Sequence, residues 1–301
     1  MTNPKPPSDK PEIPVTPDHD PVVTDTPVPG VKPAAQRDPV MVRLRRWVLR
    51  ITLALAVISP LVFMLAGLGS RLGLWSWQFG LGTLTREVGP MLLFATLIMG
   101  GVSLLAWFFI KPRRKPLWGL VVSALAVLVP VAGLVQLNAV RATAASLPFI
   151  HDITTDTQDP PSFGATIMAE RDATPGVNTV AYAGKRVRGE GTPLVSALQT
   201  QAYPEIRTLV LSEQPGVVFG RAEQAARDLG WAIKESDAEA GRIDATDTTF
   251  WYGFKDDVTI RLRPAQGGGT RLDVRSVSRV GGSDLGANAA RIGAFLDAMA
   301  E

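Results

Sequence analysis

The sequence of 301 residues contains no cysteine and only two histidines. The lack of cysteine excludes disulfide bonds, thiolate metal sites and a cysteine nucleophile. His151 is the only histidine beyond the N-terminal tail, and no serine there lies in a Gly-x-Ser-x-Gly turn, so serine-hydrolase chemistry lacks its usual parts. A phosphate-binding loop and a dinucleotide fingerprint are also missing from the sequence. We therefore predict no catalytic residue and no cofactor from motifs alone.

The net charge of +3 does not describe a basic surface. Residues 41–50 carry four arginines and no acid, and residues 111–116 carry four cations, whereas residues 141–301 contain more acidic than basic side chains. Clusters of cations beside apolar runs are typical of membrane proteins, so we expect the lipid bilayer as a partner and no nucleic acid.

Acidic residues and histidine are absent from three apolar runs, at about 47–69, 91–110 and 117–137, in a membrane region spanning 41–140. Each run has about 20 residues, enough to cross about 30 Å of hydrocarbon. A channel or transporter component is the least favoured alternative, because proton and ion pathways usually need an ionisable group within a span. Small residues predict close helix packing at Gly100 and Gly101 and at Gly119 and Ser123.

The cation clusters also predict an orientation. We expect a multi-pass protein of the bacterial cytoplasmic (inner) membrane, with a cytoplasmic N-terminus and an extracytoplasmic C-terminal domain. Residues 1–40 contain 11 prolines and predict a disordered cytoplasmic tail. The uncharged, tryptophan-containing stretch Leu72–Leu84 predicts an interfacial loop.

Residues 141–204 show little periodicity, and we interpret them as a juxtamembrane linker and an arm. His151, Asp152 and Asp156 are weak candidates for a metal site because oxygen ligands suit Ca²⁺ or Mg²⁺. Their spacing matches no established metal-binding loop, however, and aspartate and threonine before Pro-Pro are also typical of a turn. We therefore predict no metal.

Residues 205–301 predict an α+β domain with the order strand, helix, four strands, helix. Short turns between consecutive strands favour an antiparallel sheet with the two helices on one face. Val258, Ile260 and Leu262 alternate with polar residues, which predicts a half-buried strand.

The stretch from Ser276 to Ile292, with the sequence SVSRVGGSDLGANAARI, is more specific. It resembles the signature of a bacterial and plastid family known as domain of unknown function 1499. Gly230-Trp231, Gly241-Arg242-Ile243 and the run Trp251–Asp257 resemble other motifs of that family, and residues 151–161 resemble its membrane-anchored form. The resemblance covers most of residues 148–300 and implies a membrane-anchored domain without an assigned activity.

The signature residues Arg275, Arg279, Asp284, Asn288 and Arg291 allow two interpretations. One is a helix cap at Asp284 with an ion-pair network, in which Arg279 pairs with Asp284 and Arg291 with Asp256 or Asp257. The other is an anion site at a glycine-rich helix start.

A second candidate site lies at an aromatic strand end, where Trp251, Tyr252, Phe254 and Lys255 form either core packing or an interaction surface.

These features favour a non-catalytic binding or scaffold domain, with a role in envelope maintenance or in binding a lipid or an envelope protein. The alternative is an envelope hydrolase or transferase that uses Arg279, Asp284 and Asp256 or Asp257. That alternative requires the side chains to converge in one pocket and fails if Asp284 only caps its helix.

Overall fold

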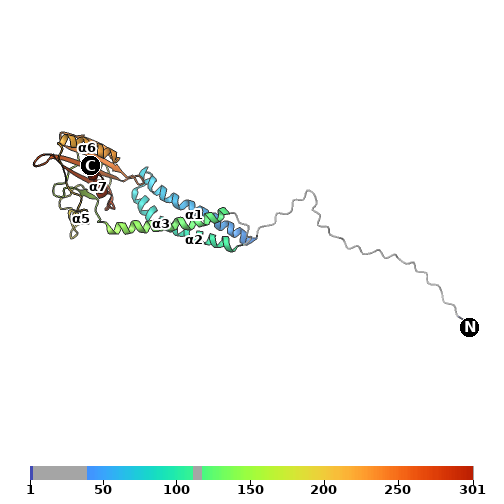
Figure 1. Ribbon diagram of the computed structural model, residues 1–301. Helices are drawn as coiled ribbons and strands as arrows, with labels where there is room; N and C mark the ends of the chain where they lie inside the picture. Colours follow the sequence, from blue (N-terminus) through green and yellow to red (C-terminus); the bar gives the residue numbers. More distant parts are fainter. Residues whose placement is uncertain (3–38, 111–116, 301) are drawn as a thin grey trace. The chain divides into compact units, whose positions relative to one another are not determined.

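The computed structural model describes residues 1–2, 39–110 and 117–300 (Figure 1). Apart from Val40, its elements belong to one compact unit, Met41–Glu301. Most of the tail predicted over 1–40, and the cationic loop between the second and third apolar runs, lie outside the described residues.

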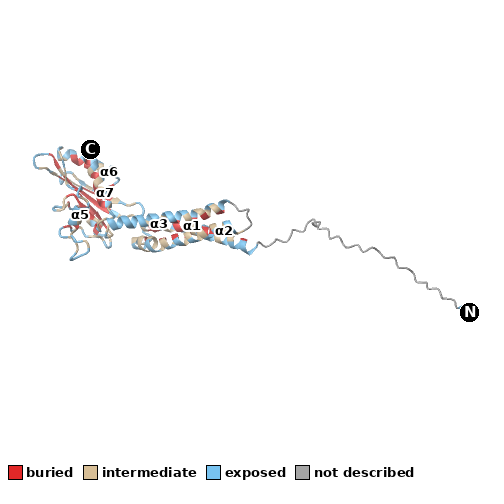
Figure 2. Cartoon of the chain, turned by 60° about the horizontal axis from the view of Figure 1, so that its bottom comes forward, coloured by how far each residue is buried: buried red, intermediate tan, exposed pale blue. Residues whose placement is uncertain are grey.

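Three long apolar helices form the N-terminal part, as predicted. They are α1 (Val40–Arg71), the π-type helix η1 (Gln78–Val88) running directly into α2 (Gly89–Phe109), and α3 (Leu117–Ser146). The segments Val40–Arg71, Gln78–Phe109 and Leu117–Ser146 are long and apolar enough to cross a membrane. Figure 2 shows that most of their residues are exposed or only partly buried, which suits a lipid environment.

The loop predicted over Leu72–Leu84 is helical in its second half, because η1 begins at Gln78, and its interfacial position stays a prediction. The chain turns over residues 72–77, where Gly73 adopts a positive φ of 72°. The indole of Trp75 then donates a hydrogen bond to Ala66 O at 3.3 Å, which holds the turn against α1.

Small and hydroxylated residues mediate the helix contacts. A Cβ at Gly100 would lie 2.7 Å from the backbone of Ala126, so α2 and α3 approach closely there. The hydroxyls of Ser103 and Ser123 join the same helices at 2.7 Å. Gly101 has open space around it and is not a packing contact, which corrects that part of the prediction.

The C-terminal part is an antiparallel sheet with helices, and the α+β prediction is confirmed. The strands are β1 (Asp152–Thr154), β2 (Leu209–Leu211), β3 (Ala232–Asp237), β4 (Arg242–Thr248), β5 (Lys255–Pro264) and β6 (Thr270–Ser278). Their order is β1-β6-β5-β4-β3, and β2 also pairs with β6, alongside residues 270–272. The helices are α4 (Ala165–Asp172), α5 (Val195–Ala202), α6 (Pro215–Asp228) and α7 (Ala287–Ala300).

The apolar core lies between one face of the sheet and the helices α6 and α7. Alternate strand residues point toward it, as a period of two requires. The core includes Ile243, Val258, Ile260, Leu272 and Val274 from the strands, with Val218, Ala222, Ile292, Phe295 and Met299 from the helices. Trp231 stacks on Phe295 with ring centroids 5.3 Å apart.

Most of the opposite face of the sheet is also buried, so the prediction of a half-buried strand over Val258–Leu262 is wrong at Thr259, whereas the side chain of Arg261 keeps 18% exposure. Thr259 and Asp257 are fully buried. Part of the cover comes from the segment expected to be an arm: Gly164 N–H donates to Asp244 and the Arg171 guanidinium donates to Asp257. Residues 152–154 of the same segment form β1, which pairs with β6 at the edge of the sheet. Hydropathy did not reveal this because the buried side chains are polar and paired with one another.

Candidate functional site

We call the sheet face opposite α6 and α7 the polar face. Four carboxylates on it, from Asp152, Asp244, Asp257 and Asp273, are fully buried. Burying an ionised carboxylate is costly unless it is paired and hydrogen-bonded. Each of the four accepts hydrogen bonds from at least one arginine.

Asp257 of β5 lies at the centre of the first cluster. It accepts from Arg171 Nη1 at 2.7 Å, from Arg279 Nε and Nη2 at 2.9 and 2.7 Å, and from Thr246 Oγ1 at 2.9 Å. Arg279 also donates to Glu170 at 2.7 Å. Hydrogen bonds from Lys234 and then Arg279 lower the pKa of Glu170 to about 2. This cluster therefore ties α4 to the sheet.

Asp152 of β1 forms the second cluster. Its two oxygens accept from Arg275 Nε and Nη2 at 3.0 and 2.9 Å. Lys185 Nζ lies 3.3 Å from both Asp152 Oδ2 and His151 Nε2, and His151 Nδ1 lies 3.3 Å from Gly282 O. Burial lowers the pKa of both His151 and Lys185. These contacts fit a neutral His151 that donates through Nδ1 and accepts through Nε2.

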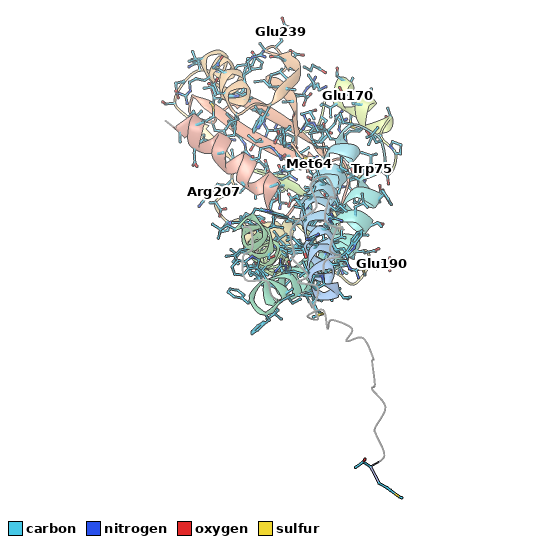
Figure 3. The ribbon with its side chains drawn as sticks, turned by 90° about the vertical axis from the view of Figure 1, so that its right-hand side faces the viewer. Met64, Trp75, Glu170, Glu190, Arg207 and Glu239 are labelled. Atoms are coloured by element: carbon cyan, nitrogen blue, oxygen red, sulfur yellow. The ribbon has the colours of Figure 1, made fainter. Side chains whose placement is uncertain are left out.

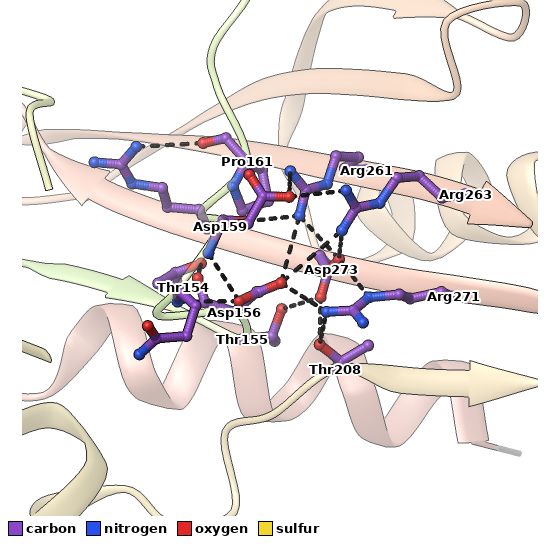
Figure 4. A network of polar contacts seen from close by, with 12 residues as sticks. Thr154, Thr155, Asp156, Asp159, Pro161, Thr208, Arg261, Arg263, Arg271 and Asp273 are labelled. Atoms are coloured by element: carbon purple, nitrogen blue, oxygen red, sulfur yellow. Dashed lines mark hydrogen bonds and ion pairs between the residues drawn. The ribbon is translucent and has the colours of Figure 1, made fainter. Parts of the chain in front are cut away.

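Asp273 of β6 forms the third cluster, drawn in Figure 4. Its Oδ2 accepts from Arg261 at 3.0 Å and from Arg263 and Arg271 at 3.3 Å. Burial alone would raise the pKa of Asp273, but hydrogen bonds from Thr208 and Arg261 bring it below its ordinary value. The three arginines also meet two further acids, Asp156 and Asp159, in the 155–161 turn.

Asp244 of β4 is the least satisfied acid on the polar face. Its Oδ2 accepts from Gly164 N at 2.9 Å and from Arg242 Nε at 3.1 Å. Within the described part of the chain, its buried Oδ1 has no hydrogen-bond partner. Burial raises the pKa of Asp244.

The weak metal candidates point to different partners. His151 and Asp152 contact Lys185, whereas Asp156 accepts from the backbone of residues 158 and 159 and from Arg271. Across residues 1–2, 39–110 and 117–300, no group of three or more metal-ligating side chains is present.

The signature residues are divided between the two faces of the sheet. On the helix side, Arg291 donates to Asp256 and Asp247, both at 2.7 Å. Of its two predicted partners, Asp256 and Asp257, Arg291 therefore binds Asp256. Asn288 donates to Ser278 Oγ at 2.9 Å and to His151 O at 3.2 Å. Arg275 and Arg279 lie instead on the polar face, where they bind Asp152 and Asp257. The structure therefore does not assemble these five residues into one anion site.

Asp284 is a helix cap. Its carboxylate accepts from Gly286 N at 2.8 Å and from Asn288 N at 3.1 Å at the start of α7. Burial raises the pKa of Asp284. The predicted pair between Arg279 and Asp284 is wrong, because Arg279 is held by Asp257 and Glu170 across the sheet. The convergence that a hydrolase or transferase site would need is therefore absent from these residues.

The aromatic residues between β4 and β5, which we call the hairpin tip (residues 249–254), contact the membrane helices rather than the domain core. Arg71 Nη1 at the end of α1 donates to the backbone oxygens of Thr249 and Phe250 at 3.1 and 2.6 Å. The hydroxyls of Tyr252 and Thr85 lie 2.6 Å apart.

Two further residues complete this candidate surface. Phe254 packs edge-on against Trp77 with centroids 5.8 Å apart and stacks on Tyr252 at 5.5 Å. Lys255 is exposed, and its backbone oxygen accepts from Arg279 N at 2.9 Å. Sequence reasoning missed Arg71 and Thr85, because nothing local links them to a hairpin more than 160 residues away.

A cavity of about 740 Å³ lies between α1 and α3 and ends at the hairpin tip. Its walls come from residues of α1 between Leu53 and Gly67, including Met64, which is labelled in Figure 3, and from residues of α3 between Val122 and Leu137. Leu93 and Thr96 of α2 and Trp251 and Tyr252 of the hairpin tip complete the lining. The hydroxyls of Ser59 and Thr96 form a hydrogen bond with each other at 2.7 Å and donate to backbone carbonyls of their own helices. Because these polar groups are satisfied, the walls of the cavity are largely apolar.

These features define a class: a chain with three helices able to cross a membrane, followed by an antiparallel α+β domain whose hairpin tip contacts them. Residues 152–299 match the family described as protein of unknown function (DUF1499), and this domain belongs to that family. The match begins at the first residue of β1 and ends within the last turn of α7. No curated protein matches the sequence. The family description assigns no activity.

Proposed function

We propose that this chain is a lipid-binding protein of the bacterial cytoplasmic membrane, in which the DUF1499 domain acts as a non-catalytic binding module. The bound lipid places an acyl chain in the cavity between α1 and α3, and the hairpin tip caps it. The observation that carries this proposal is the lining of the cavity, which combines residues of all three membrane helices with Trp251 and Tyr252 of the domain.

The chemistry of the cavity suits an acyl chain. Apolar side chains dominate its walls, and its volume falls within the 300–1,000 Å³ range of small-molecule sites. Residues 53–67 of α1 extend about 21 Å at 1.5 Å per residue, more than the half-thickness of a bilayer core, about 15 Å. An apolar cavity at this depth borders lipid tails rather than water.

The polar face supports a binding role over a catalytic one. Its arginines and carboxylates neutralise one another. Asp284, the acid of the signature considered for catalysis, caps α7 instead. Paired groups of this kind hold the fold and position the hairpin tip.

The orientation follows from charge. Arginines cluster at the start of α1, which favours a cytoplasmic N-terminus, and an odd number of spans then puts the domain outside the cytoplasmic membrane, in the cell envelope. A C-terminal alkaline phosphatase fusion should be active and a fluorescent-protein fusion at the same place dark. The reverse pattern would overturn this orientation.

The lipid is tested with two matched variants of α3. Leu125 lines the cavity and Leu128 does not, although both side chains are at least half exposed. In the full chain purified in detergent, mass spectrometry of co-purified phospholipid should find bound lipid in the wild type and in Leu128→Trp, and little in Leu125→Trp. Equal retention in the two variants would refute the lipid site. Capture of an envelope protein that Leu125→Trp does not disturb would replace it with a partner-binding function.

A further inference from the structure

A second cavity, of about 350 Å³, lies at the opposite end of α1 from the hairpin tip. The start of α1, the end of α2 and the start of α3 meet there, and Arg45 Nη1 donates to Ile110 O at 3.1 Å across the first two of these helices. The cavity is lined by three arginines (Arg45, Arg46 and Arg50), two tryptophans (Trp107 and Trp118) and smaller residues that include Gly119.

We propose that this second cavity binds the headgroup of an anionic phospholipid from the leaflet opposite the domain. Three of the described lining residues are arginines. Guanidinium groups match the phosphate of such a lipid in charge and hydrogen-bond geometry. The positive end of the α1 helix dipole adds to the attraction.

The remaining walls fit the rest of the lipid. Leu49 and Leu53 give an apolar floor beside the arginines, and the two indoles stand at the helix ends, where tryptophan marks the membrane–water interface. Gly119 leaves room at this point, because a Cβ there would already lie 3.3 Å from Leu49 and 3.7 Å from Trp107. A site with a cationic rim, an apolar floor and interfacial indoles distinguishes a phospholipid from a soluble anion.

This site shares Leu53 with the cavity under the hairpin tip, but its arginines and tryptophans line the second cavity alone, so each proposal can fail without the other. The test uses the full chain in detergent and native mass spectrometry during titration with phosphatidylglycerol or with phosphatidylcholine of the same chains. The wild type should bind phosphatidylglycerol at least about tenfold more tightly, since each interfacial arginine contributes about fivefold. Inorganic phosphate in excess should not displace the lipid.

Two pairs of variants separate the site from general charge and from folding. Arg45→Gln with Arg46→Gln should abolish the preference, whereas Arg43→Gln, which removes the same type of charge outside the cavity, should retain it. Gly119→Leu fills the cavity without changing any charge and should also abolish the preference, whereas Gly101→Leu, into open space, should not. The proposal is overturned if Arg43→Gln weakens binding as much as the paired variant, if both leucine variants bind like the wild type, or if free phosphate competes.

Discussion

Replacing Asp257 by asparagine tests whether the polar face is a buried ion-pair network. The carboxylate is fully buried, and the side chains of its partners Arg171 and Arg279 are only 2% and 4% exposed. Asparagine keeps the shape but leaves two buried guanidinium groups without their shared anion. Breaking a buried pair in this way costs about 3–5 kcal/mol. The free energy of opening of β5 and β6 should fall by that amount.

Glu170→Gln is the matched control, because Glu170 also binds Arg279 but its side chain is 32% exposed. Its pKa of about 2 reflects hydrogen bonds from Lys234 and Arg279, and solvent screening limits the loss to about 1 kcal/mol or less. Hydrogen exchange of peptides from residues 255–278, in the full chain, measures both variants. Asp257→Asn should exchange about a hundredfold to several thousandfold faster than the wild type. A change below about fivefold, or equal effects in the two variants, would refute the network.

Three further predictions concern pH, the core and the membrane helices. Burial holds the pKa of His151 below its ordinary 6.5, so the unfolded chain takes up the proton at a higher pH than the folded chain. The stability of the domain, measured by hydrogen exchange, should therefore fall as pH falls below about 6.5. His151→Gln should flatten that dependence. Phe295→Ala removes a fully buried ring stacked on Trp231 and should cost about 3–5 kcal/mol in the same assay, and a loss below 1 kcal/mol would contradict the packing. Gly100→Ala should lower the thermal stability of the membrane helices because its Cβ meets the α3 backbone, whereas Gly101→Ala should leave it unchanged or raise it slightly; the opposite order would contradict the helix packing.

The spacing of apolar residues along the sequence was sufficient to predict the architecture. Three runs without acidic residues predicted the three long helices, and alternation at Val258, Ile260 and Leu262 predicted the strand that faces α6 and α7. The helix over residues 287–300 followed from its apolar spacing and from the acid that caps it. These features depend on neighbours within a few turns of the chain.

The polar face was not predictable in the same way. Thr259 and Arg261 alternate with apolar residues as they would on a solvent-exposed face, and only contacts from residues 159–164 reveal that they are covered. Arg279 was assigned to Asp284, five residues away, but binds Asp257 on the neighbouring strand. Local spacing favours the near partner, whereas the pleat of β6 turns the side chain to the opposite face.

The contact between the hairpin tip and the helices was equally hidden. Tyr252 and Thr85 are separated by 167 residues, and each looks ordinary in its own segment. The aromatic run was predicted to be a candidate interaction surface, but only the structure shows that it contacts α1 and η1 of the same chain.

In the proposed function, the hairpin tip closes a lipid-binding cavity. The most direct measurement is photo-crosslinking of the full chain in membranes that contain a phospholipid with a diazirine in its acyl chain, followed by mapping of the labelled residues. We predict labelling of Trp251 and Tyr252 that is lost in Leu125→Trp and retained in Leu128→Trp. Labelling confined to the outer surfaces of the three helices, with the hairpin tip unlabelled, would contradict the claim.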